Sequence, residues 1–262
     1  MSLYQHELRQ SRSMTLIWAL SMAALNIICL LLFPEMKKQV SSLNEVFSSL
    51  GAFSTAFGMD QLSIATLPGF FSIECGNILG IGGGLFAAWL GTVMITREET
   101  SHTADFLYGH PISRTAIVLD KLAALITQIL LLNLIVFAAD LSGMAIIGES
   151  IPWKEVCLIH LAYLLLMLEI GLLCFSLSSL RCSSSMGLCL GLTMILYFLN
   201  LAANLNDGLQ WLRWITPYAW CEGSWIIRHG SLDWSYVCSG IGISLLAALC
   251  CLQVFSRRDL AS

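Results

Sequence analysis

FFSIECGNILGIGGGLFAAWLGTVMIT, residues 70–96, is the stretch that decides the fold. It contains one charged side chain, Glu74, and it is longer than the ~20 apolar residues that cross a bilayer core as a helix. A bilayer offers no water to the backbone, so a segment that spans it has to satisfy its own amide and carbonyl groups. We therefore expect residues 70–96 to form a transmembrane helix.

Five further apolar runs accompany this one. The chain is 57% hydrophobic and only 11% charged, whereas soluble domains carry about 25% charged residues, so a water-soluble fold is excluded. We expect an all-α integral membrane protein with one transmembrane domain over residues 1–262 and six transmembrane helices. The expected spans are 14–33, 70–96, 116–141, 155–179, 185–204 and 234–255.

The basic residues predict the orientation, because Lys and Arg near helix ends are retained in the cytoplasm. With the N-terminus inside, 8 basic residues are cytoplasmic and 5 are external. Six tryptophans fall on the external side, as in an interfacial belt: Trp153, Trp211, Trp214, Trp220, Trp225 and Trp234. We expect a multi-pass protein of the cytoplasmic (inner) membrane with both termini in the cytoplasm. The net charge of -4 provides no basic surface of the kind that binds nucleic acid.

Small residues recur every four positions in the second expected span, at Gly76, Gly80, Gly84 and Ala88. This spacing places them on one helical face, where another helix can approach closely. The face predicts either packing within the chain, or a dimer seam or pathway lining, and the sequence leaves both open. A phosphate-binding loop is excluded, because GNILGIGGG is not followed by Lys-Ser/Thr.

The longest expected cytoplasmic connection is TREETSHTADFLYGHPISRT, residues 96–115. Its first part is typical of a short helix with an acidic flank and an apolar tip, Phe106 to Tyr108, and Gly109-His110-Pro111 ends it. A short helix of this kind fits a groove in a partner protein. The simpler interpretation is that it only joins two spans.

The motifs in this connection resemble those of permease subunits of ABC-2-type (type V) ABC exporters. The resemblance lies in Arg97-Glu98-Glu99, Thr103, Phe106-Leu107, Pro111-Ile112-Ser113-Arg114 and Lys121. Two further segments are similar to the family, Leu212 to Tyr218 and the tail Phe255 to Leu260. The match extends over essentially the whole chain.

The resemblance implies a homodimer or pseudo-dimer of permeases, surrounded by membrane lipids and bound to two copies of a cytoplasmic ABC ATPase. The chain has no nucleotide-binding motif and no cofactor of its own, so ATP and Mg would bind to the partner ATPase. The coupling helix would present Glu98, Glu99, Thr103, Asp105, Phe106, Leu107 and Tyr108. Residues 3–12 would form an amphipathic interfacial helix, and residues 209–229 a pair of external half-helices broken at Thr216-Pro217.

Among the acidic residues inside the expected spans, where charge is costly, three are of interest: Glu169, Asp140 and Glu74. Glu169 lies near the middle of the fourth span, so we expect it to face the bundle or a water-filled cavity, either as a buried hydrogen-bonded carboxyl or as a substrate or proton site. Asp140 and Glu74 lie near external ends and are expected at the interface. The resemblance also implies that spans two and five line the route between protomers.

Two other functions remain open. An ion-coupled secondary transporter is compatible with Glu169. An intramembrane metallohydrolase would use Glu98, Glu99 and His102, although the Arg of related membrane proteases is replaced by Thr103, so we expect neither a metal nor a catalytic site. The favoured function is export of a hydrophobic or peptide-like substrate, such as a drug, an antimicrobial peptide or a lipid-like compound, with a role in multidrug or antimicrobial peptide resistance.

Overall fold

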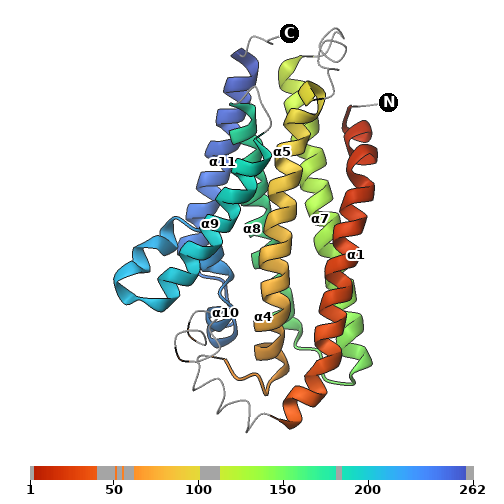
Figure 1. Cartoon of the computed structure of the whole chain (residues 1–262), viewed down its shortest axis with the longest axis vertical. Helices are drawn as coiled ribbons and strands as arrows, with labels where there is room; N and C mark the ends of the chain where they lie inside the picture. Colours follow the sequence, from red (N-terminus) through yellow and green to blue (C-terminus); the bar gives the residue numbers. More distant parts are fainter. Residues whose placement is uncertain are drawn as a thin grey trace.

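The computed structural model describes residues 3–39, 51, 55, 62–100, 113–180 and 185–257, and within these it is helical, without strands. Six helical segments are long and apolar enough to cross a membrane. The expected all-α, six-span fold is therefore confirmed. The spans (Figure 1) are α1 (Leu3–Lys38), the continuous α4 (Leu67–Ile78), η1 (Leu79–Gly83) and α5 (Gly84–Thr100), then α7 (Arg114–Ile146), α8 (Trp153–Ser179), α9 (Met186–Leu205) and α11 (Trp234–Arg257).

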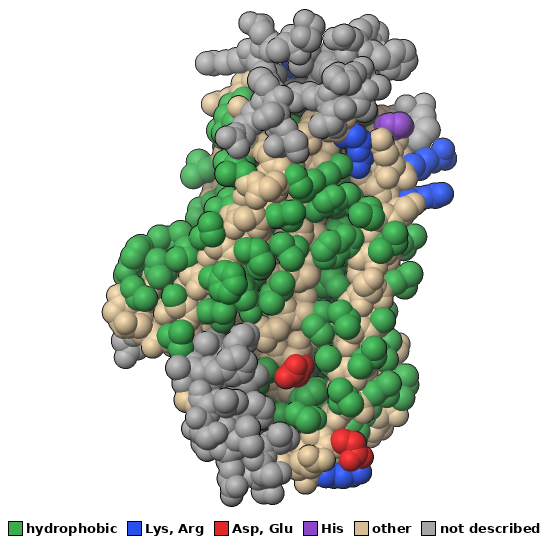
Figure 2. Space-filling model, viewed as in Figure 1, with side chains coloured by type: hydrophobic (Ala, Val, Ile, Leu, Met, Phe, Trp, Pro, Cys, Tyr) green, Lys and Arg blue, Asp and Glu red, His purple; other side chains and the backbone are tan. Residues whose placement is uncertain are grey.

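The helices form one elongated bundle. The start of α1, the end of α5, the start of α7 and the end of α11 lie together at one end, which we call the terminal end (Figure 1). Helix α1 packs along α7, and α5 packs along α8. Exposed apolar side chains cover the flank of the bundle between its two ends (Figure 2), as a lipid-facing surface requires.

Helix α1 differs from expectation at its start. Residues 3–12 are helical, but they continue into the first span without a break and do not form a separate helix. Glu7 and Ser11 on this segment are fully buried, because they face α5 and α7. The segment therefore adds two to three turns to the first span, which ends at Lys38 after Pro34.

The second span begins with a well-capped turn. The Gly69 amide donates to the Thr66 hydroxyl at 3.3 Å, and Pro68 occupies the first turn, where its missing N–H costs nothing. Further along, residues 79–83 form a π-helix, a wide turn that carries one extra residue and is common at functional sites. This turn joins α4 to α5 in the middle of the membrane-spanning segment.

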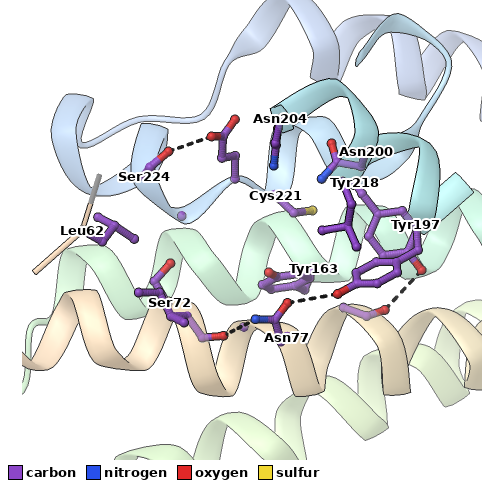
Figure 3. Close-up of a pocket in the computed structure, with 16 residues that line it drawn as sticks. Leu62, Ser72, Asn77, Tyr163, Tyr197, Asn200, Asn204, Tyr218, Cys221 and Ser224 are labelled. Carbon is purple, nitrogen blue, oxygen red and sulfur yellow. Dashed lines mark hydrogen bonds between the residues drawn. The ribbon is translucent and has the colours of Figure 1, made fainter. Parts of the chain in front are cut away.

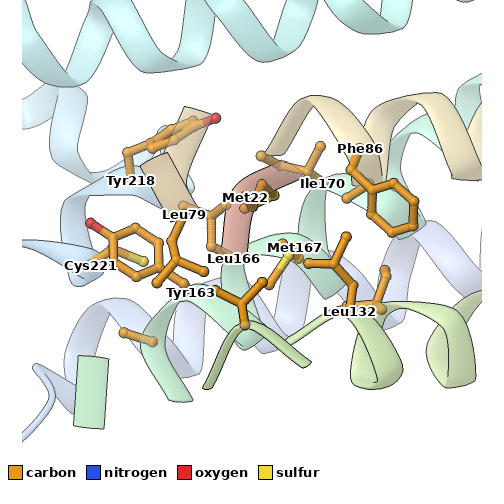
Figure 4. Packing of buried hydrophobic residues seen from close by; sticks show 14 of the residues in the cluster. Met22, Leu79, Phe86, Leu132, Tyr163, Leu166, Met167, Ile170, Tyr218 and Cys221 are labelled. Atoms are coloured by element: carbon orange, nitrogen blue, oxygen red, sulfur yellow. The ribbon is translucent and has the colours of Figure 1, made fainter. Parts of the chain in front are cut away.

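The core is concentrated around α5 and α8. Figure 4 shows Phe86, Met167, Ile170 and Leu132 packed together from three helices. The two backbones approach closely at Gly91, where an added Cβ would collide with the Gly171 carbonyl. The small residue at this crossing brings α5 and α8 into direct contact.

Between α9 and α11 the chain forms three short helices: η2 (Asp207–Trp214), η3 (Pro217–Cys221) and α10 (Gly223–His229). The expected break at Thr216-Pro217 is present, although the predicted pair of half-helices is a set of three. Thr216 fixes the break, since its hydroxyl accepts from the Tyr218 amide at 3.3 Å and donates to the Leu196 carbonyl at 2.8 Å. Trp220, expected in an interfacial belt, is instead buried.

Candidate functional site

A buried carboxylate joins three helices at the terminal end. Glu7 Oε1 accepts from Lys121 Nζ at 2.6 Å, and Glu7 Oε2 lies 3.3 Å from an Arg97 guanidinium nitrogen. Glu7 is fully buried and Lys121 is 1% exposed. We call Glu7, Arg97 and Lys121 the charged tripod. Such a pair persists away from water only when its remaining polar atoms are also bonded.

Backbone and hydroxyl groups complete the tripod. Lys121 Nζ also donates to the Met94 carbonyl at 2.6 Å, and Arg97 donates to the Ser11 hydroxyl at 3.1 Å. Arg97 lies near the end of α5 and Lys121 on the first turns of α7. The tripod therefore ties the two helices that flank the 101–112 connection to the first turns of α1.

Further hydrogen bonds hold α1 against α7 at the same end. The Tyr4 amide donates to Asp120 at 3.3 Å, the Tyr4 hydroxyl lies 3.1 Å from the Thr127 hydroxyl, and Gln128 donates to the Leu8 carbonyl at 3.0 Å. Sequence reasoning missed this arrangement, because it placed residues 3–12, which include Glu7, in an interfacial helix. The sequence signal that could have revealed it is the pair of basic residues, Arg97 and Lys121, on either side of the 101–112 connection. Two such residues need an acidic partner when they are buried, and Glu7 is that partner.

The expected coupling residues are only partly described. Thr103, Asp105, Phe106, Leu107 and Tyr108, with Pro111 and Ile112, lie outside the described residues, and Glu98 and Glu99 are described only as part of α5. Of the loop signature, Ser113 caps α7 by accepting from the Ala116 amide at 3.2 Å, Arg114 is the first residue of α7, and Lys121 belongs to the tripod. The coupling role stays a prediction.

At the other end of the bundle a polar pocket of about 70 Å³ lies between α4, α8, α9 and the short helices (Figure 3). Three tyrosines line it, Tyr163, Tyr197 and Tyr218, together with Asn77, Asn200, Asn204 and Glu222. Burial raises the pKa of the Tyr218 phenol, so this hydroxyl stays protonated and acts as a donor. The pocket combines aromatic faces with amide and hydroxyl groups that can bind an uncharged polar molecule.

The π-helix forms part of this pocket. Tyr218 donates to the Gly80 carbonyl at 3.4 Å, and Asn77 donates to the Ile73 carbonyl at 2.7 Å while it accepts from Tyr197 at 3.5 Å. A π turn breaks the regular i→i−4 pattern, so side chains from other elements can bond its carbonyl groups. The pocket is thereby linked to the middle of the second span.

The glycine face of the second span packs inside the chain at its first three positions. A Cβ at Gly76 would lie 3.0 Å from the Tyr163 hydroxyl, a Cβ at Gly80 would lie 3.1 Å from the Tyr163 ring, and one at Gly84 would collide with Tyr218. Ala88, the fourth position, is fully buried. These residues make room for the tyrosines of the pocket, and a role at a dimer seam stays a prediction.

A second buried polar cluster connects α1, α7 and α8. Asp140 Oδ2 accepts from Asn26 at 3.1 Å and lies 3.0 Å from His160 Nε2, while Asn133 donates to the His160 carbonyl at 3.3 Å. Asp140, expected at the interface near the external end of the third span, is fully buried inside the bundle. Packing of α7 between α1 and α8 covers it. Glu74 on α4, in contrast, is only half-buried.

Glu169 is buried against α11 and Trp220, as its position within the fourth span suggested, but its Oε2 has no hydrogen-bond partner among the described residues. No group of three or more His, Cys, Asp or Glu residues that could hold a metal occurs in the described ranges. His102, which belongs to the hydrolase alternative, lies outside those ranges, and His160 pairs with Asp140.

Comparison with models of known protein families gives a match. The sequence model of the family described as ABC-2 family transporter protein matches residues 1–260, which include the charged tripod, the polar pocket and all six spans. No curated protein matches the chain. The match agrees with the resemblance found in the connection between the second and third spans.

Proposed function

Because this chain belongs to the ABC-2 family of transporter proteins, we propose that it is the membrane-spanning half of an ATP-driven exporter. Permeases of this family are multi-pass transport subunits that associate with an ABC ATPase. We further propose that two ATPase copies bind two copies of this permease, in the cytoplasmic membrane and with both termini in the cytoplasm. ATP and Mg then act on the ATPase, and this chain supplies the route for the substrate.

The charged tripod supports this proposal most directly. An ATPase that pushes on the 101–112 connection displaces the end of α5 and the start of α7, the two helices that flank it. Because Glu7 bonds to both Arg97 and Lys121, the first turns of α1 move with them. Buried helices respond to such a push by shifting between discrete packed arrangements. Motion of the ATPase thus reaches three spans of the permease.

The connection itself supplies the test. We expect Phe106→Asp and Leu107→Asp to uncouple ATP hydrolysis from transport, because each places a charge on an apolar tip that would sit in a groove of the ATPase. The measurement is ATPase activity and substrate efflux of the permease–ATPase complex in liposomes. Leu180→Asp is the matched control, since Leu180 is exposed at the same end of the bundle in a different connection. Normal coupling in both connection variants would contradict the proposal.

For the substrate we propose a hydrophobic or peptide-like compound, because the apolar flank lets such molecules enter from the bilayer. A strain without the protein is then more sensitive to hydrophobic drugs or antimicrobial peptides, and the wild-type gene restores resistance. Unchanged sensitivity across both classes would contradict this substrate class and leave the ATPase coupling test unaffected.

A further inference from the structure

A groove of about 140 Å³ lies between α8 and α11, apart from the polar pocket and the charged tripod. Its walls are leucines of α8 together with Val237, Ile241 and Leu245 of α11. Ile241 is 45% exposed and Leu245 is 60% exposed, so the groove opens on the apolar flank of the bundle. A molecule dissolved in the bilayer can reach it without crossing the protein.

Two residues on the inner wall of this groove, Glu169 and Trp220, each have a buried polar atom without a hydrogen-bond partner in the described part of the chain. Glu169 is 3% exposed and Trp220 is 5% exposed, and neither Glu169 Oε2 nor Trp220 Nε1 has a hydrogen bond among the described residues. A buried polar group left unsatisfied costs about 1–3 kcal/mol. The described residues that line the groove include no Lys, Arg or His that could pair with the carboxyl group. Glu169 therefore has no basic partner on this wall.

Gly240 keeps the inner end of the groove open. A Cβ at this position would lie 2.7 Å from Glu169 Oε2 and would collide with the Trp220 ring. The carboxyl group and the indole ring therefore both border the space that the glycine leaves. A carboxylate beside an aromatic ring in an apolar wall is a favourable environment for an ammonium group.

We propose that this groove binds a hydrophobic amine from the bilayer. The amine nitrogen donates a hydrogen bond to Glu169 and lies against Trp220, and its alkyl or aryl part lies between the leucines of α8 and the exposed side chains of α11. Treating the amine as cargo rests on the proposed export function, whereas binding itself does not. The assignment narrows the substrate from hydrophobic compounds to basic ones.

A carbodiimide labelling experiment tests the site on the full chain in lipid nanodiscs. Dicyclohexylcarbodiimide adds to protonated carboxyl groups that are reached from the bilayer, and mass spectrometry locates the adduct. We expect labelling of Glu169. N,N-dimethyldodecylamine, a tertiary amine that cannot form an amide with the activated carboxyl group, should slow this labelling about tenfold, the effect of a charge-assisted hydrogen bond, and dodecanol should have little effect. Equal protection by the two compounds, or none by either, would overturn the proposal.

Two glycine variants distinguish a loss of amine binding in the groove from a general effect of mutation on the protein. Gly240→Ala narrows the inner end and should abolish protection by N,N-dimethyldodecylamine, whereas Gly242→Ala should keep it, because a Cβ there meets no atom within 4 Å. If Gly240→Ala fails to fold, Ser244→Leu on the groove wall replaces it. Protection that survives the folded groove variant counts against the site. Labelling of Glu169 only after a permease dimer is dissociated would show that a second copy covers the groove, and would also refute the proposal.

The cargo role has its own readout in the permease–ATPase complex. ATP-dependent efflux of N,N-dimethyldodecylamine from liposomes should fall in Glu169→Gln and stay at the wild-type level in Gly242→Ala. Protection in nanodiscs without efflux in the wild-type complex would overturn the cargo role alone. The nanodisc experiment contains no ATPase, so its outcome decides the site independently of the export function.

Discussion

Removal of the carboxylate at the centre of the charged tripod should destabilise the protein strongly. In Glu7→Ala, Lys121 loses the partner at 2.6 Å while its ammonium group stays buried at 1% exposure. Deleting one partner of a buried ion pair costs about 3–5 kcal/mol, mainly because the remaining charge is uncompensated. Lys121 still donates to the Met94 carbonyl, and Arg97 is partly exposed, so we expect the lower end of this range.

A loss of about 3 kcal/mol lowers the folding equilibrium constant by roughly a hundredfold, since 1.4 kcal/mol is a factor of ten. The assay is reversible unfolding in mixed micelles with increasing sodium dodecyl sulfate. The double variant Glu7→Met with Lys121→Met should regain most of the loss, because a buried pair can be replaced by apolar side chains of similar volume at little cost.

Glu35→Ala is the matched control on the same helix. Its ion pair with Lys38 is exposed on both sides, so its loss should cost less than about 1 kcal/mol. Equal stability of Glu7→Ala and Glu35→Ala, or a double variant no more stable than Glu7→Ala, would refute the assigned role of the tripod.

Three further predictions concern packing and burial. Gly91→Ala should destabilise the bundle by about 1–3 kcal/mol, because its methyl group meets a backbone carbonyl, whereas Gly187→Ala, with no atom within reach, should be neutral or slightly stabilising in the same unfolding assay. Asp140→Ala should cost about 2–4 kcal/mol, since it leaves a histidine and an asparagine without their partner; an unchanged unfolding midpoint would contradict this. Burial is the main cause that raises the pKa of the Cys221 thiol, and a nearby carboxylate adds to it, so less thiolate forms at a given pH. Maleimide should therefore modify Cys221 more slowly than the exposed Cys157, as measured by mass spectrometry. Faster modification of Cys221 would contradict this prediction.

Hydropathy was sufficient to predict the spans, because each apolar run must form a helix when it crosses a bilayer. Local chemistry also predicted the break at Thr216-Pro217. The partners of polar residues were not predictable in the same way. Glu7 and Asp140 were both assigned to the membrane interface, and both are buried, because neighbouring helices cover them. Which helices meet depends on packing between distant segments, and one sequence contains little information on that.

For the candidate sites too, single residues were predictable from the sequence, whereas their partners were not. Lys121 was identified through a motif, yet its partner Glu7 lies more than a hundred residues away in the chain. Glu169 was singled out because a carboxyl group inside a span is unusual, and burial agreed. The position of Trp220 beside Glu169 was not predicted, since a tryptophan between two spans normally lies at the membrane interface. The tyrosines of the polar pocket gave no pattern, because they come from separate elements.

The wide turn at residues 79–83 has a consequence for the second span as a whole. An α-helix advances about 100° per residue, so the extra residue of a π turn rotates everything that follows it by that angle. The tyrosine contacts of α4 and the Gly91 crossing of α5 are therefore compatible only while the turn is present. If the turn became regular α-helix, α5 would rotate relative to α4 about the helix axis. The second span would then present a different set of side chains to α8.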